Sequence, residues 1–386
     1  MCFAERVIGI KMIISNLVTV TNFILNSLAQ KGLIFELRKE ISFRNFLRLL
    51  CWLSNRFSFI GPHTVLIDIA NECHLNCIMC MYHSPFRGQH REDNMQDGIF
   101  PLDRYIRLIN ELKSLRVNRV FITGRGEPLL HPDIEEMVSI ANKAKIDTFI
   151  NTNGTCLTNE RIEKLLSCGL SGFDLSLHAG DPLTYKLIHP QCREELFEQL
   201  REHLIYLIKL REKTRQKFRL VIINVIARPN YDKITEMLEF AKLVKADKVI
   251  FKPILAFKEI KETFALRKED IEELKRKLAI VKTGITNNIP EFINFLNLFL
   301  EKKQVPHNKI SCNKICHIPW TKANICINGD VKGCIYGDLY GEQKILGNIY
   351  KESFVTIYRS NKYLRYRQQH LCPAICYGKA VYHLVI

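Results

Sequence analysis

Three cysteines in one short loop are spaced closely enough to share a metal centre. Cys73, Cys77 and Cys80 are separated by three and by two residues. Three thiolates from one loop can hold three corners of a cubane iron–sulfur cluster. Because a four-iron cluster has four corners and the loop has no fourth cysteine, one iron is left for a non-protein ligand. The alternatives are three unconnected thiols or mononuclear zinc, although structural zinc sites usually use two separated cysteine pairs.

Strand-like and helical segments alternate along the chain after residue 62. Each strand and its helix span about 25 to 30 residues, which predicts βα units and a parallel sheet. Ligands of such sheets lie at the carboxyl ends of the strands, and the cysteine loop directly follows the first strand. The predicted strands are residues 65–70, 119–123, 147–151, 172–178, 218–227 and 248–254.

Other residues suited to binding follow or end these strands. Asp174, Ser176 and His178 share one strand face by alternation. Buried polar groups need partners, so this row predicts either a ligand or an internal hydrogen-bond network. The candidates at the strand ends are Gly124, Gly126, Glu127, Asn153, Ser176 and Asn224.

The cysteine loop, with the apolar Met79 before its last cysteine, resembles that of the radical S-adenosylmethionine (radical SAM) superfamily. The resemblance extends over residues 62 to 380 and implies a partial (βα)6 barrel, an α/β fold. It implies that the open iron binds SAM. An electron from the cluster then cleaves SAM to methionine and a 5′-deoxyadenosyl radical, which takes a hydrogen atom from the substrate.

The same resemblance implies which residues meet SAM. Residues 124–127 are similar to the family's Gly-Gly-Glu-Pro motif, whose backbone and acid meet the SAM amino group; Arg125 stands where many members have glycine. Asn153 is then expected near the SAM ribose, and Ser176 near the carboxylate or ribose. The set that we expect to bind SAM is Gly124, Gly126, Glu127, Asn153, Ser176 and Asn224.

A second group of cysteines lies between residues 312 and 376 and resembles the SPASM/Twitch extension of radical SAM enzymes. There a hairpin, here expected at Asn328-Gly329, and a short helix enclose auxiliary [4Fe–4S] clusters. The full SPASM form has seven cysteines and two clusters. We expect one auxiliary cluster here, suited to electron transfer, with zinc on the same ligands as the alternative. The expected ligands are Cys316, Cys334, Cys372 and Cys376, with Cys312 in reserve and Cys326 as a strand residue.

These segments predict four parts of the chain. An amphipathic helical extension spans residues 1–61, the radical SAM core 62–255, a helical bridge 256–310, and the auxiliary-cluster domain 311–386. Within the first part, residues 12–30 carry no charge but have one polar stripe at helical spacing. Such a helix packs on the protein's own body, or lies on a membrane surface or a partner.

Composition limits the function classes. The 386 residues are 47% hydrophobic and include 14 cysteines, whose clustered spacing predicts reduced, metal-binding thiols and a cytoplasmic location. A membrane-peripheral location through residues 12–30 is the alternative. The net charge of +16 is spread along the chain without an aromatic-interleaved basic patch, which disfavours nucleic acid as a partner.

An auxiliary cluster next to a radical-generating one favours a reaction that removes two electrons. We therefore expect oxidation, dehydrogenation or cross-linking of a peptide or small polar metabolite, with an electron donor such as flavodoxin or ferredoxin. The alternatives are a tRNA- or cofactor-modifying radical SAM enzyme and a non-catalytic iron–sulfur or zinc protein that binds nucleic acid. The sequence assigns no catalytic acid or base.

Overall fold

The computed structural model describes residues 60–87, 98–254, 258–280, 292, 293, 296, 311–315, 318–334, 344–369 and 371–373. The amphipathic helices predicted before residue 60 lie outside these residues. Of the predicted bridge, α10 (Lys258–Phe264) and α11 (Lys268–Ile280) are described and are helical.

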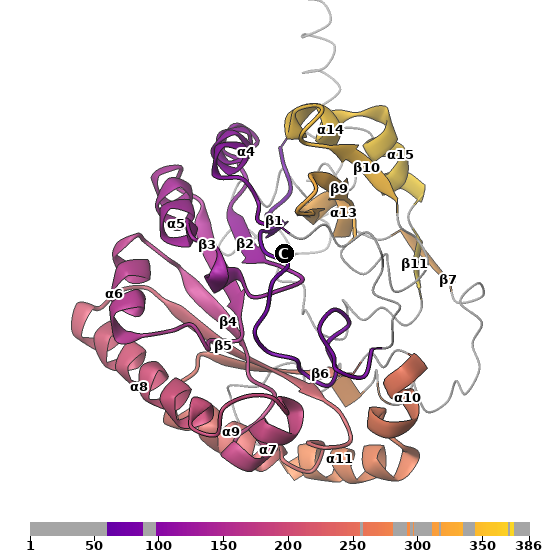
Figure 1. Ribbon diagram of the computed structural model, residues 1–386. Coiled ribbons are helices and arrows are strands. Elements are labelled where there is room, and N and C mark those ends of the chain that lie inside the picture. The colour runs from indigo at the N-terminus through magenta and orange to yellow at the C-terminus, as the bar shows by residue number, and fades with distance from the viewer. Residues whose placement is uncertain are drawn as a thin grey trace, which may run out of the picture.

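Six parallel strands form the centre of the fold and follow one another in sequence order across the sheet. Figure 1 shows them arranged as an open, curved sheet with helices along its outer side. In the described part of the chain β1 and β6 do not pair, so the barrel is partial, as predicted. The strands are β1 (Thr64–Asp68), β2 (Arg119–Thr123), β3 (Asp147–Thr152), β4 (Gly172–Ser176), β5 (Arg219–Ile226) and β6 (Lys248–Pro253).

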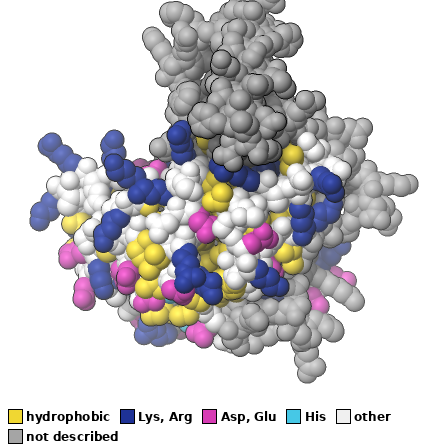
Figure 2. Space-filling model, turned by 90° about the horizontal axis from the view of Figure 1, so that it is seen from above, with side chains coloured by type: hydrophobic (Ala, Val, Ile, Leu, Met, Phe, Trp, Pro, Cys, Tyr) yellow, Lys and Arg dark blue, Asp and Glu magenta, His cyan; other side chains and the backbone are white. Residues whose placement is uncertain are grey.

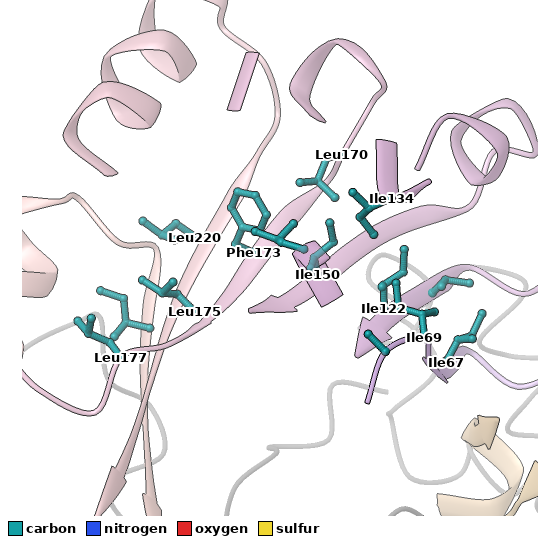
Figure 3. Packing of buried hydrophobic residues seen from close by; sticks show 14 of the residues in the cluster. Ile67, Ile69, Ile122, Ile134, Ile150, Leu170, Phe173, Leu175, Leu177 and Leu220 are labelled. Carbon is teal, nitrogen blue, oxygen red and sulfur yellow. The ribbon is translucent and has the colours of Figure 1, made fainter. Parts of the chain in front are cut away.

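The outer face of the sheet is apolar, and the helices that connect the strands cover it. Alternate strand residues such as Val120 and Ile122 are fully buried in one cluster with helix residues such as Ile134. Burial of each such side chain contributes about 1.5–3 kcal/mol. Figure 3 shows part of this cluster, which includes Ile67, Ile69, Ile150, Leu170, Phe173, Leu175, Leu177 and Leu220. The helices are α4 (Leu102–Ser114), α5 (Ile134–Lys143), α6 (Asn159–Ser167), α7 (Pro182–Ile188), α8 (Leu196–Thr214) and α9 (Ile234–Leu243).

The cysteine-rich carboxyl-terminal segment adds strands to the same sheet. β8 (Lys322–Ile325) pairs in parallel with β1, from Thr64↔Lys322 to Ile67↔Ile325. β9 (Asp330–Lys332) and β10 (Ile345–Asn348) continue the sheet as antiparallel strands. The hairpin at Asn328-Gly329 is confirmed, but its union with the barrel sheet was not predicted. The strand that leads into the cysteine loop is therefore flanked on its other side by the second cysteine-rich segment.

A half-buried acid joins the barrel to this carboxyl-terminal segment. Glu111 on α4 accepts a hydrogen bond from the backbone N–H of Phe354 at 2.5 Å, at the start of α14 (Phe354–Arg359). We expect Glu111→Ala to lower the free energy of unfolding by about 1–3 kcal/mol, since it leaves this N–H without a partner. Denaturant unfolding checks this, with Glu239→Ala on the exposed side of α9 as the matched control. Equal stability of the two variants would contradict it.

Candidate active site

The three cysteines of the loop after β1 are each held by a hydrogen-bond donor. Backbone N–H groups of Tyr82 and His83 lie 3.3 and 3.2 Å from the Cys80 Sγ. The Asn153 Nδ2 lies 3.7 Å from the Cys73 Sγ. The ring of His189 lies beside the sulfur of Cys77 and is the third candidate donor. Donors of this kind stabilise a thiolate, which is the form that binds metal.

Burial dominates the acidity of these thiols. It raises the pKa of Cys73 to about 11, and it also raises the pKa of Cys77 and of Cys80. The charge of Cys80 adds to the effect of burial on Cys73 and on Cys77, raising the pKa of both. Metal binding deprotonates the thiols in spite of their raised pKa values, because the metal binds the thiolate form. The donor chemistry and the N–H partners fit a cluster that needs three thiolates.

No three His, Cys, Asp or Glu side chains within the described residues are close enough to share one metal ion. A cubane cluster does not require three ligands around one ion, because each thiolate binds a different iron. Three cysteines separated by three and by two residues in the sequence suit that arrangement.

The loop after β2 packs directly against the cysteine loop. The N–H of Gly126 donates to the Ala70 carbonyl at 3.0 Å, and the N–H of Glu127 donates to the Glu72 carbonyl at 2.7 Å. A Cβ on Gly126 would overlap the Glu72 carbonyl, and one on Gly124 would overlap that of Ala70. The two glycines therefore allow the loops to approach each other, a packing role that the resemblance to the SAM-binding motif did not predict.

The carboxylate of Glu127 is fully buried and connects β2 to β3. One oxygen accepts from the Leu129 N–H at 2.9 Å and from the Thr152 hydroxyl at 2.6 Å; the other accepts from the Asn153 N–H at 2.8 Å. Burial raises its pKa, and these three donors lower it. Contact between this acid and the SAM amino group stays a prediction, since its oxygens already have three internal donors.

Asn153 lies between the same strand end and the cysteine loop. Its Oδ1 accepts from the N–H and the hydroxyl of Thr155, while its Nδ2 faces Cys73. Thr155 also contacts the His74 ring. The side chain thus positions the first cysteine, and its predicted contact with the SAM ribose is untested.

The polar row of β4 has internal partners. The Ser176 hydroxyl donates to the Asn151 Oδ1 at 3.2 Å, and one oxygen of Asp174 lies 3.5 Å from the Arg219 guanidinium. β4 ends at Ser176, so the predicted strand 172–178 is too long. His178 follows with a φ of 66°, and its Nδ1 accepts from the Val225 N–H.

Asn224 lies on the other face of the sheet from this row. It alternates with Val225 and shares its face with Ile222 and Ile226, which belong to the helix-covered core. Its amide is fully buried and has no hydrogen-bond partner among the described residues. Its predicted role in SAM binding has no support from this placement and stays a prediction.

The second cysteine set is described in part. Cys334, half-buried, follows β9 and lies close enough to Tyr363 to act on it electrostatically. β11 (Leu371–Pro373) pairs with β7 (Ser311–Ile315), Leu371 opposite Ile315 and Pro373 opposite Ser311, which places the backbone of Cys372 opposite the middle of β7. The structure does not describe Cys316, Cys376 or the side chain of Cys372. Cys326, expected as a strand residue, lies just after the end of β8. Burial raises the pKa of its thiol, and Asp68 adds to this effect.

One residue near the thiols was missed by the sequence argument. His189, directly after α7, has its Nδ1 3.1 Å from the Cys77 Sγ, and its ring is fully buried. Burial lowers its pKa to about 4. No spacing rule connects position 189 with position 77, so only the tertiary contact identifies it.

The family follows from matches over both cysteine-bearing regions. Residues 67–241 match the radical SAM superfamily, and residues 316–378 match the SPASM iron–sulfur cluster-binding domain. The chain belongs to the radical SAM superfamily and is an enzyme with a SPASM region. Its cofactors are SAM and iron–sulfur clusters.

Similar proteins have several functions. The tungsten-containing aldehyde ferredoxin oxidoreductase cofactor-modifying protein of Pyrococcus furiosus is 24% identical over 78% of this chain and 82% of its own length. A PqqA peptide cyclase of Streptomyces rochei is 26% identical, over 49% of this chain and 47% of its own length. The structure of Streptococcus suis SuiB bound to the precursor peptide SuiA shares the fold, with a TM-score of 0.58, 17% identity, and coverage of 92% and 81% of the two chains.

Side chains of both charge signs occur on the face of the described residues that Figure 2 shows. Figure 2 shows Lys and Arg side chains interspersed with Asp and Glu on the face seen from above. No helix among the described residues has both the length and the apolar character needed to cross a bilayer.

Proposed function

We propose that this enzyme oxidises or cross-links a peptide by removing a hydrogen atom with a radical derived from SAM. The observation that supports it is the convergence of three thiols with the ends of β2 and β3 at one edge of the sheet. Peptides are the substrates named for the PqqA cyclase relatives and the ligand named for SuiB.

In this proposal Cys73, Cys77 and Cys80 ligate the SAM-cleaving cluster, which supplies the electron that converts SAM to a 5′-deoxyadenosyl radical. The protein's part is to position the loop. Glu127 fixes the end of β3 relative to the loop after β2, and Asn153 donates to Cys73. We propose Gly124, Gly126, Glu127, Asn153 and Ser176 as the residues around SAM.

The second cysteine set supports a reaction that removes two electrons. Cys316, Cys334, Cys372 and Cys376 are proposed to hold an auxiliary [4Fe–4S] cluster, which with four thiolates has no open iron and suits electron transfer. Such a cluster takes the second electron after hydrogen abstraction. The first substrate electron leaves with the abstracted hydrogen atom. A flavodoxin or ferredoxin is proposed to supply the separate electron with which the SAM-cleaving cluster cleaves SAM.

Cofactor modification is the second candidate. The Pyrococcus furiosus relative matches most of this chain, whereas the match to the peptide cyclase covers about half of it. The longer match to the Pyrococcus furiosus relative favours a related reaction on a cofactor or another small metabolite.

The first experiment is anaerobic reconstitution followed by iron and sulfide analysis and by assay of 5′-deoxyadenosine formed from SAM and dithionite. We expect about eight irons per chain, as two four-iron clusters require, together with deoxyadenosine. About four irons with deoxyadenosine would remove the auxiliary cluster from the proposal. An intact cluster without deoxyadenosine would contradict the assignment of the cysteine loop.

Transfer of deuterium distinguishes the two substrate classes. The reconstituted enzyme is incubated with dithionite, unlabelled SAM and a library of synthetic peptides that carry deuterated amino acids. We expect deuterium in deoxyadenosine and a peptide lacking two hydrogen atoms. Deuterium transfer from an extracted small cofactor, with peptides unchanged, would favour the second candidate.

A further inference from the structure

The contact between His189 and Cys77 differs from the contacts of the other two cysteines. Backbone N–H groups meet the sulfur of Cys80, and the side-chain amide of Asn153 meets that of Cys73. Only Cys77 faces an aromatic ring, at 3.1 Å from Nδ1. This donor can be changed by substitution without altering the backbone of the loop.

The protein holds this ring firmly in place. The Tyr185 ring packs against it with ring centroids 4.3 Å apart. Its Nε2 lies 3.4 Å from the Leu177 carbonyl oxygen, a longer contact than the 3.1 Å between Nδ1 and sulfur, and the neutral ring has one N–H to give to either acceptor. The N–H of Ile78 also donates to the Ile188 carbonyl at 3.0 Å, which ties the cysteine loop to the end of α7. Both ends of the Nδ1···Sγ contact are therefore fixed by the fold.

The direction of the hydrogen bond follows from the chemistry of sulfur. A thiolate bound to iron has no proton and can only accept, so the ring has to donate its Nδ1–H to Cys77. Hydrogen bonds to cluster sulfurs help to set the reduction potential. A donor stabilises the reduced cluster more than the oxidised one, because reduction adds a negative charge that the sulfurs share.

We propose that His189 is a positioning residue that raises the reduction potential of the SAM-cleaving cluster through its hydrogen bond to the Cys77 thiolate. The inference rests on the cysteine loop's assignment to that cluster. Dithionite or a flavodoxin then reduces a larger fraction of the cluster than it would without this donor.

Three variants test the proposal. His189→Leu removes the donor and keeps an apolar side chain in the pocket. His189→Asn places an amide nitrogen near the position of Nδ1 and keeps a donor. Tyr185→Phe is the matched control, since it keeps the ring packed on His189 and removes a hydroxyl that has no partner among the described residues.

The measurement is the midpoint potential of the reconstituted cluster, followed by electron paramagnetic resonance and read beside the iron content. We expect a more negative potential for His189→Leu, so that at a fixed solution potential the ratio of reduced to oxidised cluster falls about tenfold, or about 59 mV for one electron. His189→Asn and Tyr185→Phe should stay near the wild-type value. A wild-type potential in iron-loaded His189→Leu overturns the proposal.

If the His189→Leu chain does not assemble its cluster, a second measurement still tests the proposal. Wild-type enzyme labelled with ¹⁵N-histidine should show a pulsed-resonance coupling between the reduced cluster and one nitrogen, and His189→Asn should lack it. The same coupling in both proteins overturns the proposal. Failure of the wild-type chain to bind iron at the loop would instead contradict the proposed function.

Discussion

Cys77→Ala is expected to abolish the formation of 5′-deoxyadenosine. Cys77 is the central thiol of the loop, and the pKa of its thiol is raised by both neighbouring thiols as well as by burial. Without it only two protein ligands remain for a cluster that already has one open iron. We expect iron content to fall by about half, because the auxiliary cluster persists. Iron analysis and chromatographic assay of deoxyadenosine measure both effects.

The matched control is Cys168→Ala. Cys168 is a half-buried free thiol at the end of α6. It should keep wild-type iron content and SAM cleavage, which separates loss of a ligand from loss of any cysteine. Deoxyadenosine formation by Cys77→Ala at the control's rate would contradict the ligand assignment.

Glu127→Ala is expected to have the largest effect on stability. The substitution leaves three donors without their acceptor: the N–H groups of Leu129 and Asn153 and the hydroxyl of Thr152. Each hydrogen bond to a charged group contributes about 1.5–3 kcal/mol, so we expect the free energy of unfolding to fall by about 3 kcal/mol or more. Chemical denaturation of the apo-protein measures this without any dependence on the cluster.

Two further variants sharpen this test. Glu127→Gln keeps an oxygen acceptor but turns an NH₂ group toward one donor, so it should lose roughly half as much stability as the alanine variant. Glu136→Ala, in the exposed first turn of α5, should change stability by at most about 0.5 kcal/mol. If Glu127→Ala is as stable as Glu136→Ala, the carboxylate does not connect the two loops.

Gly124 and Gly126 show that the position of a motif and the role of its residues are separate predictions. Sequence reasoning located Gly124 and Gly126 and placed them after a strand, and the structure agrees. From the resemblance to a family motif, it expected their backbone to meet SAM. The structure adds that Ala70 and Glu72 already occupy the space that a Cβ would need. A sequence reports where glycine stands, but not which neighbour excludes a side chain.

By itself the sequence determined the cysteine loop, the order and type of the barrel strands, and the family that both imply. These depend on local spacing and on hydrophobic alternation, which are properties of neighbouring residues. The tertiary structure decided what neighbours in sequence cannot specify. It joined β8 to β1, gave the Glu127 carboxylate three internal donors, and brought His189 to Cys77 across 112 positions. Such contacts arise only when the whole sheet and its covering helices are packed, because packing sets the distances between residues far apart in the chain.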